Sequence, residues 1–454
     1  MKPVAVLLAV GCLLSSASGQ WREATISVGM SGWYLAYNST SNKVYCGSIV
    51  DTNVVVIDGA TNRVDTTVAV GFGTYGLVYD SADNKVYCSN VDTNFVTVID
   101  GAADTILARI PVGHVPIAFV CNPAGSKVYC AIWGAYPAVE SSVAVIDAAA
   151  DTVITTVEMG AKAPTTMIYN PRSNKVYCAC DSNVVVVIDG AADTVIARLA
   201  AGTWPCALAY NATNNKVYCS NHGSRNVTVI DGAADTVIAT VRFGTGAYYL
   251  AYNSANNKVY CSNVADENIT VIDGLADTVI TTITVAARPC GLLYNSINNK
   301  VYCLVNNGSV QVINGATDSV IKTIGSVGLV PVAIAWNPVQ NRTYVSATGS
   351  HYLTVIRDSM PPGVEERQAS ETRRALPEAI IVHGVLHLRS SPYPLPAGEG
   401  QRVRVRSLLL DAAGRTAMRP TPGANDVRHL SPGVYFLRLE GEADPATRKL
   451  VLQR

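Results

Sequence analysis

The sequence has little charge and no excess of either sign, which argues against partners held by bulk electrostatics. Charged residues make up 15% of the chain, and 34 Lys and Arg balance 34 Asp and Glu. Nucleic acids and anionic membranes attract proteins with a basic excess, so we expect neither as a partner. Phe and Met are also scarce, at 5 and 6 residues, whereas Tyr, Val, Asn, Thr and Gly are abundant. This composition favours strands joined by tight turns.

Sequence motifs of common catalytic and metal sites are missing as well. Gly-x-Ser-x-Gly, His-Glu-x-x-His, Cys-x-x-Cys and a phosphate-binding glycine loop do not occur in the sequence. We therefore expect no cofactor, no metal site and no catalytic residue, which favours a non-catalytic protein over an enzyme. An acidic dyad assembled from distant segments stays open.

No hydrophobic run is long enough to span a membrane, and the most apolar one opens the chain. Lys2, the run Val4–Leu14 and the small residues before Gln20 predict a secretory signal peptide over residues 1–19, cleaved near Gly19. Cys12 also resembles a bacterial lipoprotein site, but the apolar run continues beyond it. The mature protein is expected to be secreted and to have no transmembrane segment.

A repeat of about 42 residues dominates the sequence. Each unit contains four short apolar runs separated by turns rich in Asn, Asp and Gly; in the second unit the runs are 75–79, 85–89, 95–99 and 105–112. Four-stranded units at this spacing predict an all-β fold, a β-propeller with one unit in each blade. The string Lys-Val-Tyr-Cys marks seven units and is degenerate in the eighth; it begins at Lys43, Lys85, Lys127, Lys175, Lys216, Lys258, Lys300 and Arg342.

The two ends of the repeat region predict how the ring closes. Residues 25–29 match the fourth strand of a blade, and the eighth unit stops after three strands near Arg357. We expect Thr25–Val28 to pair with the third strand of the last blade, which removes both exposed sheet edges. The result is an eight-bladed propeller over residues 20–358. Seven blades is the alternative if one unit is irregular.

The repeated strings resemble those of the YVTN family of β-propellers, which are secreted or cell-surface proteins of bacteria and archaea. The family pattern is matched by Tyr252-Asn253, by Asn257-Lys258-Val259-Tyr260 and by Val271-Ile272-Asp273, and most other units between residues 22 and 358 match it too. Cys stands where the family more often has Val. The family is heterogeneous in function, so the resemblance implies a fold rather than an activity.

The composition changes after Asp358. Residues 359–378 are rich in Pro and charge and are predicted to form a linker. Strand-like runs at 384–388, 402–410, 433–439 and 449–452 then predict a small β-sandwich over 379–454. This segment resembles the C-terminal sorting domain of the type IX (Por) secretion system. The resemblance implies export to the surface of a Gram-negative bacterium or to the medium, with the secretion machinery as a partner; an accessory sandwich without a sorting role is the alternative.

The cysteines follow the repeat, which argues against a disulfide framework. Equivalent positions in neighbouring blades should lie on the order of 10 Å apart, whereas a disulfide needs Cα atoms within roughly 7 Å. We expect buried free thiols at the seven equivalent positions, with pairing still open for Cys121–Cys130, Cys206–Cys219 and Cys290–Cys303. The equivalent residues are Cys46, Cys88, Cys130, Cys178, Cys219, Cys261 and Cys303.

Two charged positions recur in each unit. We expect the repeat Lys to be a solvated residue at a turn end, with an anion-binding ring as the alternative. The Asp of Val-Ile-Asp is expected to cap an Asx turn, because Asp-Gly-Ala-Ala-Asp offers too few oxygen ligands for calcium.

Loop variation singles out one face. The turns at one end of the blades are nearly invariant, whereas the connections at the other end differ between copies and carry aromatic residues, Arg and His. These residue types on rigidly held loops are typical of binding sites, although ordinary loop drift gives the same pattern. The candidate binding residues are Trp33, Tyr75, His114, Trp133, Tyr136, Trp204, His222, Arg225, Tyr248, Arg288 and His351.

We therefore expect a monomeric binding or structural module that recognises a carbohydrate, a peptide or an envelope component through this face. The alternative function is a hydrolase or lyase with its site at the channel mouth. The sequence offers Glu140, His114 and His222 on that face, but they come from separate blades and form no motif.

Overall fold

The computed structural model describes residues 19–29, 31–134 and 141–359, followed by seven strands between Ala379 and Leu452. These residues contain strands and turns and no helix. The chain divides into two units, Met1–Glu365 and Glu366–Arg454, and the division lies within the predicted linker. Residues 1–18, the core of the predicted signal peptide, lie outside the described residues.

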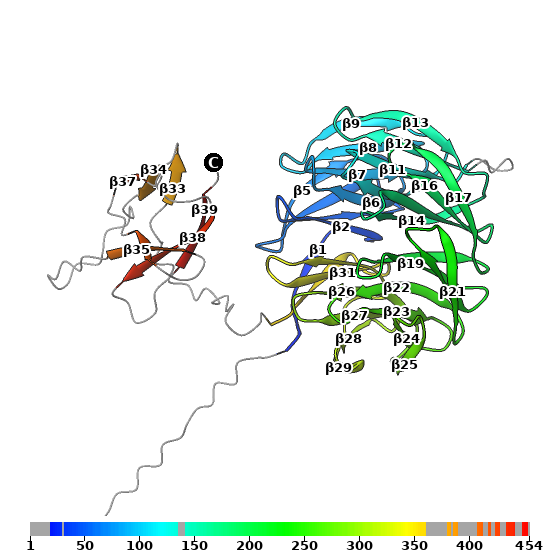
Figure 1. The fold of residues 1–454 in the computed structure, drawn as a ribbon. Helices are drawn as coiled ribbons and strands as arrows, with labels where there is room; N and C mark the ends of the chain where they lie inside the picture. Colours follow the sequence, from blue (N-terminus) through cyan, green and yellow to red (C-terminus); the bar gives the residue numbers. More distant parts are fainter. Residues whose placement is uncertain are drawn as a thin grey trace, which may run out of the picture. The chain divides into compact units, whose positions relative to one another are not determined.

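The first unit is an eight-bladed β-propeller, as predicted, with each blade a four-stranded antiparallel sheet (Figure 1). First strands contact one another around the ring, and β30 meets β2, so they form the inner wall. They are β2 (Tyr34–Asn38), β6 (Thr74–Asp80), β10 (Pro116–Asn122), β14 (Pro164–Asn170), β18 (Pro205–Asn211), β22 (Ala247–Asn253), β26 (Pro289–Asn295) and β30 (Pro331–Asn337).

The second and third strands form the middle of each blade and are almost fully buried. The second strands are β3 (Lys43–Gly47), β7 (Lys85–Asn90), β11 (Lys127–Ile132), β15 (Lys175–Cys180), β19 (Lys216–Asn221), β23 (Lys258–Asn263), β27 (Lys300–Val305) and β31 (Arg342–Ala347). The third strands are β4 (Asn53–Asp58), β8 (Phe95–Asp100), β12 (Ser142–Asp147), β16 (Val184–Asp189), β20 (Asn226–Asp231), β24 (Asn268–Asp273), β28 (Ser309–Asn314) and β32 (Tyr352–Arg357).

The fourth strands form the outer rim. In seven blades they follow the third strand directly, as β5 (Arg63–Ala69), β9 (Ile106–Pro111), β13 (Thr152–Glu158), β17 (Thr194–Ala200), β21 (Thr236–Arg242), β25 (Val279–Thr284) and β29 (Ser319–Ile324). In the eighth blade the fourth strand is β1 (Trp21–Ser27), which pairs with β32 in a register that places Thr25 opposite Thr354. The predicted closure by the N-terminal strand is confirmed.

Blades adhere through apolar clusters that each draw on two neighbouring sheets. Val54 and Val56 of the first blade, for example, pack with Val86 and Cys88 of the second. The Tyr of each Lys-Val-Tyr-Cys string is fully buried in such a seam. Burial of alternate Val, Ile and Tyr side chains from both sheets supplies the main stabilisation of the ring.

The repeat lysines are not solvated, and that expectation was wrong. Each of the seven reaches an Asp in the next blade: Lys43 Nζ lies 2.6 Å from Asp104, and Lys216 Nζ lies 2.7 Å from Asp277. The buried Tyr two residues after the Lys donates its hydroxyl to the same carboxylate, as Tyr218 does to Asp277 at 2.6 Å. In each of these seams the Lys ammonium and the Tyr hydroxyl of one Lys-Val-Tyr-Cys string therefore both donate to one Asp carboxylate of the next blade.

The Asx-turn prediction is confirmed. In the second blade Asp100 accepts hydrogen bonds from the backbone N–H groups of Ala102 and Ala103, at 2.8 and 2.9 Å. The other Val-Ile-Asp residues bind their turns in the same way.

A second ring of polar contacts joins the hairpins between first and second strands. In seven seams an Asn at the end of the first strand donates to an Asn of the next blade, as Asn38 does to Asn84 at 2.8 Å. The seam between the second and third blades differs in both residues. Asp80 stands in place of the Asn that donates, and Ser126 stands in place of the Asn that accepts. Asp80 is buried, and its burial raises the pKa of the carboxyl despite a backbone hydrogen bond from Ala82.

Replacing Asp80 by Asn should therefore stabilise the protein by about 1 kcal/mol at neutral pH, because the amide restores a donor and removes a buried charge. A folded-state pKa above the unfolded value makes wild type less stable as pH rises through that folded pKa, so the gain should grow from pH 4 to pH 7.5. Urea unfolding at both pH values measures it. The reverse change, Asn38→Asp, is the matched control and should destabilise; a gain that is larger at pH 4 would contradict this account.

Cysteines of the propeller are free thiols, and all seven repeat-equivalent ones are buried. Strand register explains why the three open pairs do not form. Cys130 faces Phe119, whereas Cys121 faces Val128. In the other two pairs the blade Cys faces a Leu of the first strand.

The second unit contains two antiparallel sheets. One has the order β33 (Ala379–Val382), β34 (Val385–Leu388), β37 (Gly423–Asp426), and the other has the order β36 (Thr416–Met418), β35 (Arg406–Asp411), β38 (Gly433–Glu440), β39 (Thr447–Leu452). Four of these strands overlap the predicted runs. None of the described segments in either unit is a helix with the length and hydrophobicity of a membrane span.

Candidate binding site at the loop face

The variable connections form a face whose loops are tied to one another by backbone hydrogen bonds. In the fifth blade the N–H of His222, just after β19, donates to the carbonyl of Trp204, just before β18, at 2.8 Å. The same bond joins Trp133 to Val115 and Asn306 to Arg288, both at 3.0 Å. Side chains on this face are therefore carried by a repeated, rigid backbone rather than by free loops.

Four aromatic rings meet on this face at the seam between the fifth and sixth blades. Trp204 and His222 lie parallel, with centroids 6.0 Å apart and planes inclined by 5°. Tyr248, at the start of β22, meets His222 edge-on at 5.6 Å, and Tyr249 lies 4.7 Å from Tyr248. We call these four residues the aromatic cluster. Trp204 is 58% exposed and Tyr248 is 37% exposed, so the cluster presents rings to solvent.

Two further tyrosines approach the cluster from the other side of the channel. Tyr34 of β2 and Tyr75 of β6 pack at 5.5 Å between centroids. Burial raises the pKa of the Tyr34 phenol, and so do the nearby phenols of Tyr75, Tyr249 and Tyr248. Tyrosines of the first, second and sixth blades thus converge at the loop end of the channel.

The backbone of Trp204 is held in the left-handed region, at a φ of 56°. This conformation belongs to the repeat, since the corresponding residue also has a positive φ in five other blades, where it is Gly73, Val115, Ala163, Gly246 and Val330. A left-handed residue other than glycine costs roughly 1–2 kcal/mol, so a Trp here is tolerated rather than selected for stability.

Buried polar groups fix the backbone beneath Tyr248. The buried Ser220 donates its hydroxyl to the Tyr248 carbonyl at 2.6 Å and accepts the N–H of Ala207 at 3.1 Å. Cys206 Sγ lies 3.4 Å from the carbonyl of Ala247. Burial raises the pKa of the Cys206 thiol, so it acts here as a neutral contact and not as a nucleophile.

The structure gathers Trp204, His222 and Tyr248, and it pairs Tyr75 with Tyr34. The other described candidates lie at the same end of the propeller but outside the cluster. Trp33 precedes the first strand of the first blade, Arg225 shares the turn of His222, and Trp133 is 47% exposed in the third blade. Arg288 and His351 are exposed in the seventh and eighth blades. Tyr136 and Glu140 lie outside the described residues.

A hydrolase or lyase would need catalytic side chains close together, and among the residues that the structure describes His114 and His222 do not form such a pair. The ring of His114 lies 3.1 Å from the side chain of Asn94 in the second blade, whereas His222 belongs to the aromatic cluster. No group of three His, Cys, Asp or Glu side chains able to hold a metal occurs among the described residues.

Tyr34 and Tyr249 were missed by the sequence reasoning, which looked for variable residues in the connections between strands. A comparison of the repeats offered the signal: their position holds only small residues in the other six blades, namely Gly76, Ala118, Thr166, Ala207, Gly291 and Ala333.

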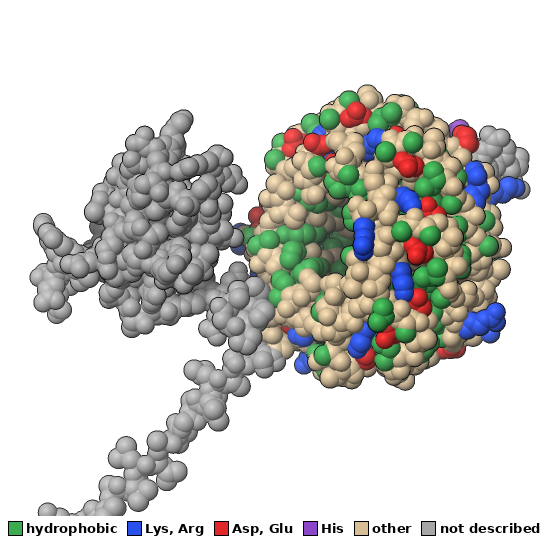
Figure 2. All heavy atoms as spheres, in the orientation of Figure 1, with side chains coloured by type: hydrophobic (Ala, Val, Ile, Leu, Met, Phe, Trp, Pro, Cys, Tyr) green, Lys and Arg blue, Asp and Glu red, His purple; other side chains and the backbone are tan. Residues whose placement is uncertain are grey.

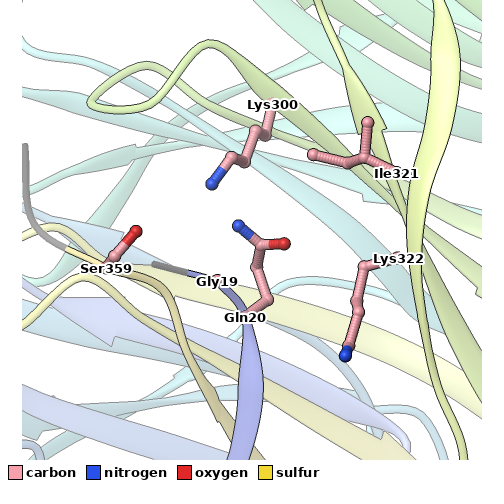
Figure 3. Close-up of a pocket in the computed structure, with 6 residues that line it drawn as sticks. All are labelled: Gly19, Gln20, Lys300, Ile321, Lys322 and Ser359. Carbon is pink, nitrogen blue, oxygen red and sulfur yellow. The ribbon is translucent and has the colours of Figure 1, made fainter. Parts of the chain in front are cut away.

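Figure 2 shows one side of the first unit, on which hydrophobic side chains line a hollow and Lys, Arg, Asp and Glu side chains lie beside it. A separate pocket of about 390 Å³ lies where β1 begins and β32 ends, lined by Gly19, Gln20, Lys300, Ile321, Lys322 and Ser359 (Figure 3). Two of its polar groups already have a structural partner, since Lys300 and Gln20 both contact Asp358, at 2.7 and 2.8 Å. This pocket belongs to ring closure and not to the loop face.

Solved structures share the propeller. Sqt1 of Saccharomyces cerevisiae superposes with a TM-score of 0.64 and 11% identity, over 74% of this chain and 98% of that one. The computationally designed Ika8 protein gives a TM-score of 0.60 and 15% identity, over 73% and 98%. Hydrazine synthase of Kuenenia stuttgartiensis gives 0.53 and 16%, over 64% and 97%. No protein-family model and no curated protein matches the chain. The likenesses show the fold alone.

Proposed function

We propose that this protein is a secreted, non-catalytic recognition module that binds its ligand through the loop face, at the aromatic cluster. The observation that carries the proposal is the solvent-exposed stacking of Trp204 on His222 beside Tyr248. Exposed aromatic rings on a rigid frame are characteristic of binding hot spots.

The resemblance of the repeats to the YVTN family supports a surface location, and the predicted signal peptide supports export. We further propose that the C-terminal unit directs the chain to the cell surface or medium. Two segments with independent export signals suit a protein that meets its ligand outside the cell.

Trp204→Gly should weaken ligand binding by about thirtyfold or more, which corresponds to about 2 kcal/mol, while leaving the fold intact. Glycine already occupies the equivalent positions at Gly73 and Gly246, so the variant relieves backbone strain and should unfold at a similar or higher temperature. Retention of solubilised envelope material on immobilised protein measures binding. Phe72→Ala is the matched control: Phe72 is an exposed aromatic residue in another connection of the same face, between β5 and β6, outside the aromatic cluster. Equal retention by wild type and Trp204→Gly would show that the cluster is not the binding site.

Export depends, on this proposal, on the C-terminal unit. A chain ending after Met360 keeps Ser359, whose carbonyl accepts hydrogen bonds from Asn298 and Asn341, so the propeller should remain folded. We expect this variant to accumulate in the periplasm while the full chain reaches the surface or medium. Fractionation of producing cells distinguishes the two; identical distribution of both chains would refute a sorting role.

A further inference from the structure

We propose that the ligand of the loop face is a neutral glycan chain, whose sugar rings stack on Trp204 and Tyr248 and whose hydroxyls bond to the tyrosines of the channel mouth. The inference rests on the proposed function, since it names the ligand class of the same site. It follows from three properties: the lack of charge on the inner wall beside the aromatic cluster, the form of the aromatic surface and the state of its phenols.

Lack of charge sets the class of ligand. The positions of Tyr248 and Tyr249 and their equivalents, at the start of each first strand or just before it, make sixteen positions (two in each of eight blades) around the loop end of the inner wall, and none is charged. An acidic polymer or a phosphate would need basic groups along this wall, and a strongly cationic peptide would need carboxylates. Arg225, in the turn of His222, lies close enough to Asp266 for their opposite charges to interact. The sixteen residues are Trp33, Tyr34, Tyr75, Gly76, Ile117, Ala118, Thr165, Thr166, Cys206, Ala207, Tyr248, Tyr249, Cys290, Gly291, Val332 and Ala333.

The aromatic surface is a flat ring with a wall at its edge. Trp204 is exposed and stacks on His222 with planes inclined by only 5°, and Tyr248 stands almost perpendicular to His222, at 76°. A pyranose presents an apolar face of C–H groups and a rim of hydroxyls. A flat ring beneath that face and a perpendicular wall at its edge bury apolar area without requiring charge.

The phenols supply the polar contacts. Burial raises the pKa of Tyr249 and of Tyr248, so both hydroxyls stay neutral and can donate as well as accept. Tyr34 and Tyr75 reach the same region from the first two blades. Sugar hydroxyls have the same dual capacity, and the arrangement of phenols on opposite sides of the channel suits a chain of several sugars rather than one small molecule.

Calorimetric titration of the full-length secreted protein tests the inference. The probes are neutral hexasaccharides of glucose, mannose and N-acetylglucosamine, an acidic hexasaccharide of galacturonic acid, an uncharged hexapeptide and tetramethylammonium, because a cage of aromatic rings also suits a quaternary cation. We expect at least one neutral hexasaccharide to bind, with an affinity that changes less than twofold between 50 and 500 mM salt. Trp204→Gly and Tyr248→Ala should each weaken it about thirtyfold, and Phe72→Ala less than twofold.

Tighter binding of the acidic sugar, of the peptide or of tetramethylammonium would overturn the glycan inference, and so would the absence of binding to every neutral hexasaccharide. The experiment distinguishes a wrong ligand class from a wrong proposed function. If no neutral sugar binds but envelope material is still retained through Trp204, recognition stands and its ligand class is different. If retention does not depend on Trp204, the proposed function fails with it.

Discussion

Replacing Glu23 by Gln should lower the free energy of unfolding by about 2 kcal/mol, because this carboxylate holds the ring closed. Arg342 donates two hydrogen bonds of 2.6 Å to it, and Arg357 a third of 3.1 Å. The side chains of Arg342 and Glu23 are only 8% and 21% exposed, so the lost contact leaves a poorly hydrated guanidinium. Urea unfolding of wild type and variant measures the difference. Glu158→Gln is the control, since this glutamate is exposed at the end of the equivalent outer strand of the third blade.

The closure should also weaken in acid. Burial alone would raise the pKa of Glu23, but the hydrogen bond and charge of Arg342, together with Arg357, outweigh it and lower the pKa. A depressed folded-state pKa gives stability that is present above the unfolded value, near 4.3, and lost as pH falls through the folded one. The difference between wild type and Glu23→Gln should therefore shrink below pH 4. A difference that is independent of pH, or a variant as stable as wild type, would contradict the closure described here.

Asp277→Asn should cost about 2 kcal/mol as well, because it removes the counter-charge of Lys216 in a largely buried seam. Asn tolerates the left-handed backbone of this position, at a φ of 56°, and can still accept from the Tyr218 hydroxyl. The effect therefore isolates the ion pair. Thermal or urea unfolding measures it, and removal of both charges, in Lys216→Met/Asp277→Asn, should recover part of the loss.

The same hairpin offers a matched control. Asp273 accepts the N–H groups of Leu275 and Ala276, at 2.8 and 3.0 Å, and an Asn can cap this turn equally well, as Asn314 does in the next blade. Asp273→Asn should thus stay within 0.5 kcal/mol of wild type. If both substitutions have the same effect, the seams do not depend on the ion pairs.

The fold could be predicted because the sequence signals for strands and turns recur in every blade. Strand boundaries, turn residues and the orphan strand at 25–29 are all local signals, and eight copies remove the ambiguity of any single one. The role of Lys216 could not be predicted by the same means, because its partner Asp277 lies in the next blade, 61 residues further along. The sequence did contain one indication of the pairing. In the eighth unit Arg342 replaces the Lys and Asn62 replaces the corresponding Asp, and Arg342 pairs with Glu23 instead.

The residues of the candidate site could largely be predicted from the sequence, but their contacts could not. Comparison of the copies identified the loop face and three members of the aromatic cluster. That Trp204 stacks on His222, and that Tyr248 of the next blade closes the edge, depends on the seam between two blades and on the backbone bond from His222 to Trp204. Neither follows from spacing along the chain.

Indole N–H signals offer the most direct measurement of where ligand binds. The chain has 5 Trp, of which Trp204 lies in the aromatic cluster and Trp336 lies on β30 at the opposite end of the inner wall, bonded to Asn341. Protein labelled with ¹⁵N at the tryptophan indoles would be titrated with the best-binding envelope fraction or oligosaccharide. We predict that the Trp204 signal shifts in step with binding while the Trp336 signal stays in place. A shift of Trp336 with an unmoved Trp204 would contradict the central claim that the loop face recognises the ligand.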